Sequence, residues 1–236
     1  MTAGDLLIIV PSRGRPGSIA RLLDAVHATR KLDTHVHVAV DSDDPRLGEY
    51  EAVMKDHGGD GDRMDCGPRK SLTGWTNDIA VRWAGEYPFL ASLGDDMVPR
   101  TPGWDRALTR AITDLGGTGF SYPHDGIRTD VPEAVVMSSD IVRALGWMAN
   151  PALEHFWIDN TWADLGRGAG CIRHLRVVVV EHLHPDAGKA AGDGTYAESN
   201  KKIPADRDAY FRWRAERMAA DVETILRLRQ KTLQPA

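Results

Sequence analysis

Two adjacent aspartates, Asp95 and Asp96, follow an apolar segment in the stretch FLASLGDDMVP, residues 89–99. The apolar residues predict a buried strand that ends at Gly94. Neighbouring carboxylates repel each other, and without a cation this repulsion raises the pKa of one of them. Mg²⁺ is usually held by one or two carboxylates together with substrate phosphates. The pair therefore suggests a sparse site for Mg²⁺ or Mn²⁺, and an ordinary polar turn is the alternative.

Two histidines stand two positions apart in the stretch VEHLHPDAGKA, residues 180–190. In an extended segment His182 and His184 point the same way, so one or both could give the cation a nitrogen ligand, which Mn²⁺ accepts more readily than Mg²⁺. The alternative places His182 in the core and His184 in a surface turn. A His-x-His pair also occurs in the zinc sites of metallohydrolases, but such sites need further ligands, and the other histidines show no spacing that demands convergence.

A third group of residues combines aromatic side chains with a carboxylate. Asp159 lies between Trp157 and Trp162 in EHFWIDNTWADLG, residues 154–166. Aromatic faces suit sugar rings or bases, and a carboxylate between them could accept a proton from a substrate hydroxyl. The alternative is the start of an amphipathic helix, with the tryptophans in the core and Asp159 or Asn160 as its cap.

The elements that must position these residues begin with a strand, a helix and a second strand. LLIIV, residues 6–10, is a continuous apolar run, and HVHVAVDSDD alternates valines before its acidic end. This order predicts a βαβ unit with a right-handed parallel crossover. Polar clusters follow three successive predicted strands, namely Pro11-Ser12-Arg13, Asp41-Ser42-Asp43-Asp44 and Asp95-Asp96. Ligands bind at that edge of open α/β sheets, so three clusters together favour a site over three unrelated turns.

The rest of the pattern predicts loops and further helices. Residues 45–70 are predicted to be loop-rich, and residues 185–200 have the composition of a mobile loop. The remaining predicted elements are helices at 72–84 and about 103–115, a short strand and a helix within 131–146, a strand ending in the two histidines, and a helix at 206–232. There is no internal repeat and no long linker, so we expect one domain.

The composition restricts the class of protein. The chain has 236 residues, 42% of them hydrophobic and 27% charged, with a net charge of −5 and a pI near 6.0. This profile is that of a soluble globular protein without the basic charge of a typical nucleic-acid binder. The two cysteines lie in dissimilar contexts, which fits a reducing compartment. No apolar run approaches the ~20 residues of a membrane span, and the apolar start is a first strand rather than a signal peptide, so we expect a cytoplasmic protein.

Five motifs in order carry a family resemblance: LLIIVPSRGRP, VAVDSDD, SLTGWTNDIAVRW, FLASLGDDMVP, and the later HFWIDNTWADLGRGAG with VVVVEHLHP. They resemble family 2-like GT-A glycosyltransferases, particularly small bacterial and bacteriophage members, over roughly residues 5–200. The resemblance implies one α/β, Rossmann-like GT-A domain with a mixed, mainly parallel sheet flanked by helices. Its nucleotide-sugar-binding half would span about 1–100 and its acceptor half about 101–205, before a C-terminal helix at 206–232.

The resemblance implies a set of residues on the donor side of the site. Carried over position by position, these residues are Pro11, Ser12, Arg13, Asp41, Asp43, Arg69, Asn77, Asp95 and Lys189. Asp41 would meet the base, Asp43 would lie near the ribose, and Asp95 would lie near the ribose or the sugar. Lys189, in the glycine-rich loop, would close over the pyrophosphate and exclude water.

The metal site is implied in the same way. Asp96 would be the direct ligand of Mn²⁺ or Mg²⁺, and His182 or His184 would complete its shell. Gly94 stands at the first position of the Asp-x-Asp motif that is usual in the family. The cation would neutralise charge on the leaving nucleoside diphosphate.

The implied activity is the transfer of a hexose or pentose from a nucleotide-diphosphate donor to an acceptor hydroxyl. Asp159 matches the catalytic carboxylate of inverting relatives, with Ile158 where Glu is usual, and in a retaining enzyme it would position the acceptor. Glycans, protein side chains, small metabolites and hydroxymethylated bases of phage DNA remain open as acceptors. Arginines that could gather on the acceptor side are Arg128, Arg143, Arg167, Arg173 and Arg176.

Two other functions compete with this one. The GT-A fold also suits a nucleotide-binding protein or a nucleotidyltransferase, but the latter should carry a lysine in its first loop, where PSRGRPGS has arginines. The His-x-His metallohydrolase is the other, and it predicts tightly bound zinc.

Overall fold

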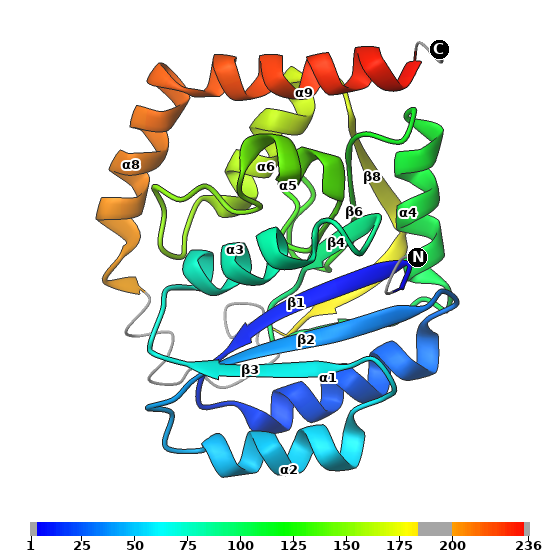
Figure 1. Ribbon diagram of the computed structural model, residues 1–236, viewed down its shortest axis with the longest axis vertical. Coiled ribbons are helices and arrows are strands. Elements are labelled where there is room, and N and C mark those ends of the chain that lie inside the picture. The colour runs from blue at the N-terminus through cyan, green and yellow to red at the C-terminus, as the bar shows by residue number, and fades with distance from the viewer. Residues whose placement is uncertain (1–3, 184–199, 234–236) are drawn as a thin grey trace.

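The computed structural model describes residues 4–183 and 200–233, which form an eight-stranded sheet with helices on both faces (Figure 1). The strands are β1 (Leu6–Ser12), β2 (Thr34–Asp41), β3 (Arg63–Gly67), β4 (Phe89–Ser92), β5 (Met97–Pro99), β6 (Phe120–His124), β7 (Val135–Ser138) and β8 (Ile172–His182). The helices are α1 (Pro16–Thr29), α2 (Leu47–His57), α3 (Leu72–Trp83), α4 (Trp104–Asp114), α5 (Ser139–Leu145), α6 (Ile158–Gly168), α8 (Ile203–Glu216) and α9 (Met218–Leu233).

The sheet is mixed, in the order β3-β2-β1-β4-β7-β6-β8-β5. Strands β3, β2, β1 and β4 are parallel neighbours, whereas β7 is antiparallel to both β4 and β6. Because β7 is antiparallel to both neighbours, β6 runs in the same direction as β4, and β8 runs parallel to β6. The carboxyl ends of β1, β2, β4 and β8 therefore meet at one edge of the sheet, as the arrowheads in Figure 1 show for β1 and β8.

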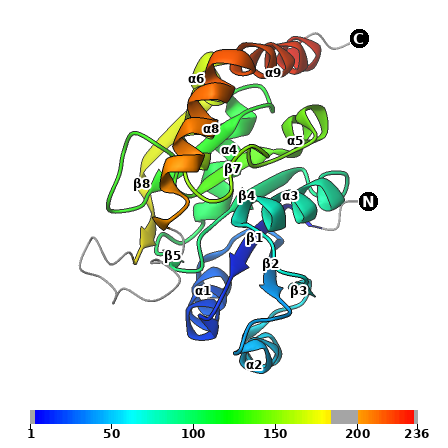
Figure 2. The same cartoon turned by 90° about the vertical axis from the view of Figure 1, so that its left-hand side faces the viewer.

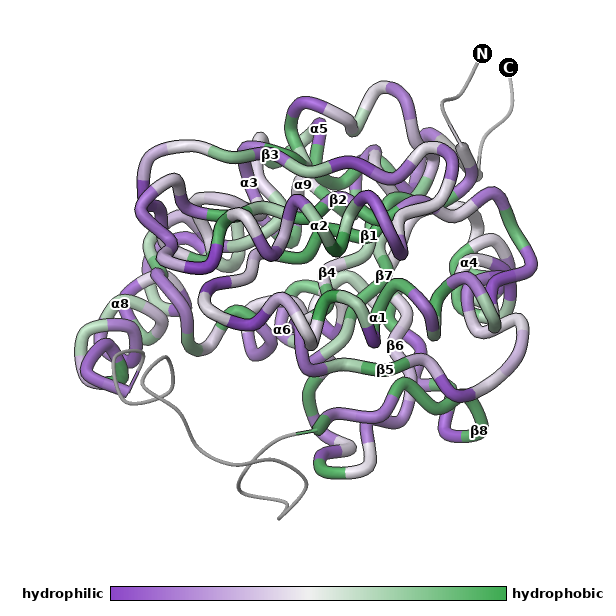
Figure 3. Tube along the Cα trace, turned by 90° about the horizontal axis from the view of Figure 1, so that it is seen from below, coloured by the Kyte–Doolittle hydropathy of each residue, from purple (hydrophilic) through white to green (hydrophobic). Residues whose placement is uncertain are grey.

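Two apolar layers form because successive side chains of a strand point to opposite faces. Leu7 and Ile9 of β1 pack with α3, α5, α6, α8 and α9, whereas Leu6, Ile8 and Val10 pack with α1, α2 and α4. Figure 3 shows the hydrophobic colour gathered on the central strands and one side of the helices around them. The predicted α/β fold with a mixed central sheet is confirmed.

The predicted loop-rich segment 45–70 is wrong in part, because it contains α2 and β3. Both elements give weak sequence signals. Helix α2 has a single fully buried side chain, Tyr50, and β3 is an edge strand with no buried residue. Strand β6 was likewise not predicted.

The single C-terminal helix predicted at 206–232 is also wrong. The chain forms two helices, α8 and α9, which meet at an angle, as Figures 1 and 2 show, and Arg217 lies between them. Arg217 leaves the helical conformation, with φ −126°. Trp213 Nε1 donates to Asp221 Oδ2 across the bend at 2.8 Å, which fixes the angle between the two helices.

Two further findings concern the described residues. None of their helices combines the length and the apolar character that a membrane span requires. Both cysteines are free, with Cys66 exposed and Cys171 buried.

Candidate functional site

A cleft of about 650 Å³ opens at the edge where the strand ends meet. Its walls come from the ends of β1, β2, β4 and β8, the start of α3, the segment before α6 and the start of α8. The edge of the sheet that sequence reasoning selected is therefore hollowed in the structure.

Asp95 and Asp96 lie on the floor of the cleft and face different partners. Asp95 Oδ2 accepts a hydrogen bond from Ser12 Oγ at 2.6 Å, and Ser12 Oγ is also 2.8 Å from the hydroxyl of the buried Tyr50. Burial raises the pKa of Asp95 to about 6, and the neighbouring charge of Asp96 acts in the same direction. Arg15 Nη1 lies 3.3 Å from Asp95 Oδ1 and 3.9 Å from Asp96 Oδ2. Asp95 is thus held by a hydrogen bond from the buried Ser12, whereas Asp96 lies beside two cationic side chains, Arg15 and His182.

The second of those cationic side chains is His182, the last residue of β8. Residue 182 pairs with Met97 of β5, and Leu183 N donates to Asp96 O at 2.9 Å, so the backbone itself holds His182 beside Asp96. His182 Nε2 lies 3.3 Å from Asp96 Oδ1, and Nδ1 lies 2.7 Å from Glu133 Oε2. Burial opposes protonation, but the hydrogen bonds to Asp96 and Glu133 outweigh it and raise the pKa of His182 to about 10.

These side chains fit a divalent cation. Ligand atoms lie roughly 2.1 Å from such an ion, so two ligands at right angles are about 3.0 Å apart, close to the separation of His182 Nε2 and Asp96 Oδ1. Glu133 leaves Nε2 directed at Asp96, which is the usual arrangement of a metal-binding histidine with a carboxylate behind it.

Further protein ligands are few. Within residues 4–183 and 200–233, no group of three or more His, Cys, Asp or Glu side chains is arranged to hold a metal ion. A pair of ligands suits an ion that shares its shell with substrate phosphates rather than the zinc set of a metallohydrolase. His184, the other predicted ligand, and Lys189 lie outside the described residues and stay predictions.

Asp41 anchors the wall of the cleft on the side of β2. Its carboxylate accepts hydrogen bonds from Trp75 Nε1 at 2.7 Å, Lys70 N at 3.1 Å and Arg13 Nη1 at 3.0 Å. Arg13 also donates to Asp43 Oδ1 at 2.6 Å, and this hydrogen bond holds the pKa of Asp43 below its usual value. The result is a recess bordered by the guanidinium of Arg13, which can stack on or donate to a planar base, and by Trp75, whose ring centroid lies 4.6 Å from Lys70 Nζ.

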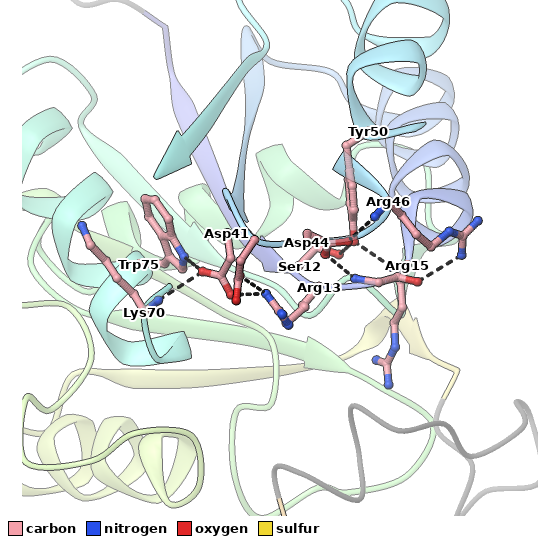
Figure 4. A network of polar contacts seen from close by, with 11 residues as sticks. Ser12, Arg13, Arg15, Asp41, Asp44, Arg46, Tyr50, Lys70 and Trp75 are labelled. Carbon is pink, nitrogen blue, oxygen red and sulfur yellow. Dashed lines mark hydrogen bonds and ion pairs between the residues drawn. The ribbon is translucent and has the colours of Figure 1, made fainter. Parts of the chain in front are cut away.

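The turn after β1 is held by side chains from α2 and the segment before it (Figure 4). Gly14 has a φ of 72°, which glycine adopts without strain. Asp44 Oδ2 accepts from Gly14 N at 2.7 Å, and Arg46 Nη1 donates to Gly14 O at 3.1 Å. The hydroxyl of Tyr50 accepts from Arg15 N at 2.7 Å. The unpredicted helix α2 therefore fixes the turn that borders the cleft.

Asp159 lies in the first turn of α6, on the opposite side of the cleft. Burial raises the pKa of Asp159, and Arg128 Nη1 lies 3.9 Å from Asp159 Oδ2. Trp162 is buried and donates to a backbone carbonyl, as the core interpretation predicted, whereas Trp157 is only half-buried and lines the cleft. The predicted cap is wrong, because the N-cap is Trp157, not Asp159 or Asn160.

The segment before α6 is fastened to α8. Asp206, which is 2% exposed, accepts hydrogen bonds from the backbone N of Glu154, His155 and Phe156 at 2.8 to 2.9 Å. Burial lowers the pKa of His155, and the charge of Lys202 acts in the same direction. Helix α8 thus positions one wall of the cleft.

Most predicted site residues come together at this cleft. Those that line it are Pro11, Ser12, Arg13, Asp41, Arg69, Asp95, Asp96, Asp159 and His182. Asp43 reaches it through Arg13. Asn77 does not line it: its amide group bonds to the backbone of Met148 and Ala149 at 2.8 to 2.9 Å, so a donor contact by this side chain is not supported.

The five arginines do not gather as one group. Arg128 lies beside Asp159, and Arg167 donates to Asp130 O, close to the same loop. Arg143 instead donates to Ala84 O at the end of α3. An acceptor surface made of all five is therefore not formed.

Sequence reasoning missed Arg15, Tyr50, Trp75, Glu133 and Asp206. Arg15 and Trp75 stand inside motifs already singled out, PSRGRPGS and SLTGWTN, and Glu133 is a charge placed directly before an apolar strand. The positions of these three residues in the sequence could have identified them as candidate site residues. The sequence around Asp206 gives no such indication, because its role depends on where α8 packs.

The comparisons with known proteins agree on the fold. No family model and no curated sequence matches the chain. Among solved structures, S. aureus TarS 1-349 is 12% identical with a TM-score of 0.58, over 75% of this chain and 60% of that one, so the chain spans less than two thirds of its length.

Two further structures carry ligands in the complexes described. The mannosyltransferase PcManGT from Pyrobaculum calidifontis, in complex with GDP-Man and Mn²⁺, is 11% identical with a TM-score of 0.57, over 98% of this chain and 85% of that one. Glucosyl-3-phosphoglycerate synthase from Mycobacterium tuberculosis, in complex with Mn²⁺, UDP and glucosyl-3-phosphoglycerate, is 10% identical with a TM-score of 0.57, over 78% and 75%. The chain therefore has the GT-A fold of glycosyltransferases, as the resemblance predicted.

Proposed function

We propose that this protein is a metal-dependent glycosyltransferase, which moves a sugar from a nucleotide-diphosphate donor to an acceptor hydroxyl. The observation that carries the proposal is the cleft in which Asp96 and His182 face each other at 3.3 Å and which Asp159 and the recess beside Asp41 also border. The fold neighbours support the donor class, since one of them is described with GDP-Man and Mn²⁺ and another with UDP and Mn²⁺.

The donor would bind with its base in the recess beside Asp41. Trp75 and Arg13 border that recess, and the hydrogen bonds of Asp41 keep both in place. Asp96 and His182 would hold Mn²⁺ or Mg²⁺, with Glu133 orienting the imidazole. When bound, the cation supplies charge neutralisation to the leaving diphosphate.

Asp159 would accept the proton of the acceptor hydroxyl as that oxygen attacks the sugar. Burial raises the pKa of Asp159, which makes its carboxylate a stronger base than that of an exposed aspartate. Trp157 lines the same side of the cleft and would exclude water from the sugar. In a retaining reaction the same carboxylate would position the acceptor.

The residues on the acceptor side of the cleft indicate the shape of the acceptor but do not identify it. Phe156, Trp157 and Asp159 offer aromatic surface with one carboxylate, which suits a hydroxyl on a ring. An acceptor screen with glycans, peptides, small metabolites and hydroxymethylated DNA would distinguish the four classes.

The decisive experiment is donor binding and hydrolysis by the purified protein. We expect UDP- or GDP-sugars to raise the melting temperature in the presence of Mn²⁺, because a ligand of the native state stabilises it by mass action. D96N and H182A should lose the metal-dependent part of this shift, about tenfold or more in affinity. H57A is the matched control, since His57 is an exposed histidine paired with Asp24 on α1.

The proposal fails if no nucleoside diphosphate binds with or without Mn²⁺. Stoichiometric zinc in the purified protein would instead favour the metallohydrolase. Release of pyrophosphate from a nucleoside triphosphate would favour the nucleotidyltransferase.

A further inference from the structure

Arg15 places a second cation against the acidic couple. Its Nη1 lies 3.3 Å from Asp95 Oδ1 and 3.9 Å from Asp96 Oδ2, and its side chain is only 14% exposed. His182 Nε2 approaches Asp96 from its other oxygen. Asp96 therefore lies between a guanidinium and an imidazole, and the guanidinium occupies space beside the proposed ion.

The backbone under Arg15 is fixed. The Tyr50 hydroxyl accepts from Arg15 N at 2.7 Å, and Gly14 is held on its N–H by Asp44 and on its carbonyl by Arg46. Figure 4 shows the side chain of Arg15 leaving this network, away from Tyr50 and Asp44. Any change of partner by the guanidinium must therefore come from its own side-chain torsions, while its Cα stays at the mouth of the cleft.

A guanidinium binds carboxylates and phosphates in the same way, through paired charge-assisted hydrogen bonds. It can exchange one partner for the other with little loss of interaction. A divalent ion on Asp96 repels the guanidinium, whereas a diphosphate on that ion attracts it. Both forces drive the same exchange, from the carboxylates to the diphosphate.

We infer that Arg15 is an internal counter-cation, which weakens the binding of free divalent ions and then binds the donor's diphosphate, so that ion and diphosphate bind cooperatively. The inference deepens the proposed function and rests on it for the identity of the diphosphate. Its basis in this chain is the position of Arg15 between Asp95 and Asp96 and the fixed turn that carries it.

The test is calorimetric titration of wild type, R15Q and R15K with three probes: Mn²⁺ alone, pyrophosphate in excess Mn²⁺, and UDP or GDP in excess Mn²⁺. We expect R15Q to bind Mn²⁺ alone several-fold more tightly and pyrophosphate about tenfold more weakly, so the coupling between ion and diphosphate falls. R15K keeps the charge but not the fork of donors. It should bind Mn²⁺ as wild type does and pyrophosphate several-fold more weakly.

R110Q is the matched control, because Arg110 pairs with Asp114 on the exposed side of α4. It should change none of the three affinities. Equal Mn²⁺ affinity in wild type and R15Q would overturn the inference. A raised Mn²⁺ affinity in R15K would also overturn it, and this second comparison tests the inference if R15Q does not fold.

The inference and the proposed function fail differently. A wild-type protein that shows the Mn²⁺ and pyrophosphate results but binds neither UDP nor GDP contradicts the glycosyltransferase and leaves the role of Arg15 intact. A protein that binds UDP or GDP with Mn²⁺, but shows no difference between wild type and R15Q, keeps the glycosyltransferase and removes the role of Arg15.

Discussion

Asp206 of α8 accepts a hydrogen bond from the backbone N–H of His155, 51 residues earlier in the chain, at 2.9 Å. The neighbouring N–H groups of Glu154 and Phe156 donate to the same carboxylate. One buried side chain therefore fastens the wall of the cleft that precedes Asp159. This contact joins α8, which carries none of the proposed catalytic residues, to the geometry of the site.

Replacing Asp206 by Ala should destabilise the protein and loosen that wall. Three N–H groups lose their acceptor, and each unsatisfied buried group costs about 1–3 kcal/mol, partly relieved by water, so we expect a loss of about 3 kcal/mol in the free energy of unfolding. Urea denaturation and amide hydrogen exchange at 154–156 measure it. D208A, at the exposed Asp208 on the same helix, should stay within about 0.5 kcal/mol of wild type. Unchanged exchange at 154–156 in D206A would contradict the fastening role.

Replacing Glu133 by Gln should weaken metal binding without removing a ligand. Glu133 accepts from His182 Nδ1 at 2.7 Å and so directs Nε2 at Asp96. Loss of such an orienting carboxylate typically costs 10- to 100-fold in metal affinity, and titration with Mn²⁺ measures it. E223Q on α9, an exposed glutamate paired with Arg227, is the control. An affinity equal to that of wild type would show that His182 needs no orientation by Glu133.

Replacing Asp159 by Asn should remove turnover and spare donor binding. If Asp159 takes the acceptor proton, kcat should fall by about 10²- to 10⁴-fold, while the dissociation constant of the nucleoside diphosphate stays the same. Steady-state kinetics and titration with UDP or GDP give the two numbers. D114N, on the exposed face of α4, serves as control. A D159N variant that retains wild-type kcat would assign proton transfer to another group.

Replacing Arg128 by Gln should shift the pH profile of kcat/KM. The Arg128 guanidinium, 3.9 Å from Asp159, favours the charged carboxylate and so lowers its pKa against the raising effect of burial. Without Arg128 the pKa of Asp159 rises, so the acidic limb of the profile moves to higher pH, by a small amount because Arg128 is partly exposed. If the acidic limb of the R128Q profile stays at the wild-type pH, that limb reflects the ionisation of a group other than Asp159.

Removing the metal should leave the fold intact. Residue 182 pairs with Met97 across β5 and β8, and Leu183 N donates to Asp96 O, so the two proposed ligands are neighbours through backbone contacts alone. We expect protein treated with EDTA to keep its circular dichroism spectrum and cooperative unfolding. Adding Mn²⁺ at ten times its dissociation constant should add about 1.4 kcal/mol. Unfolding by the chelator would mean that the ion organises the strands.

Strong periodic patterns in the sequence were enough to predict much of the fold. The run at 6–10 became β1, the apolar stripe at 72–84 became α3, and the helix expected at about 103–115 became α4. Helix α2 and strand β3 were missed because they bury little apolar surface of their own and rest on the neighbouring helix and strand. The bend at Arg217 was missed because a continuous stripe does not show where a helix turns over a core.

The site followed a similar rule. Asp41, Asp95 and Asp96 were predicted to share an edge because parallel strands end together, and the structure brings them to one cleft. Glu133 reaches His182 only because β7 is antiparallel to β4, and the sequence pattern does not contain that pairing. Asn77 stands in a plausible motif but turns toward the backbone at 148–149, since the direction of a side chain depends on the packing of its helix.

Trp157 is the single non-glycine residue with a positive φ, 61°, in the part of the chain that the structure describes. A side chain in this region of the backbone map costs about 1–2 kcal/mol, which persists only where the surroundings leave no other conformation. The neighbouring residues on each side, held by Asp206 and by the first turn of α6, leave none. A backbone fixed in this way would present the Trp157 side chain to the proposed acceptor from one position. Under the proposed function, selectivity would then come from rejecting acceptors of the wrong outline rather than from adapting the cleft to each one.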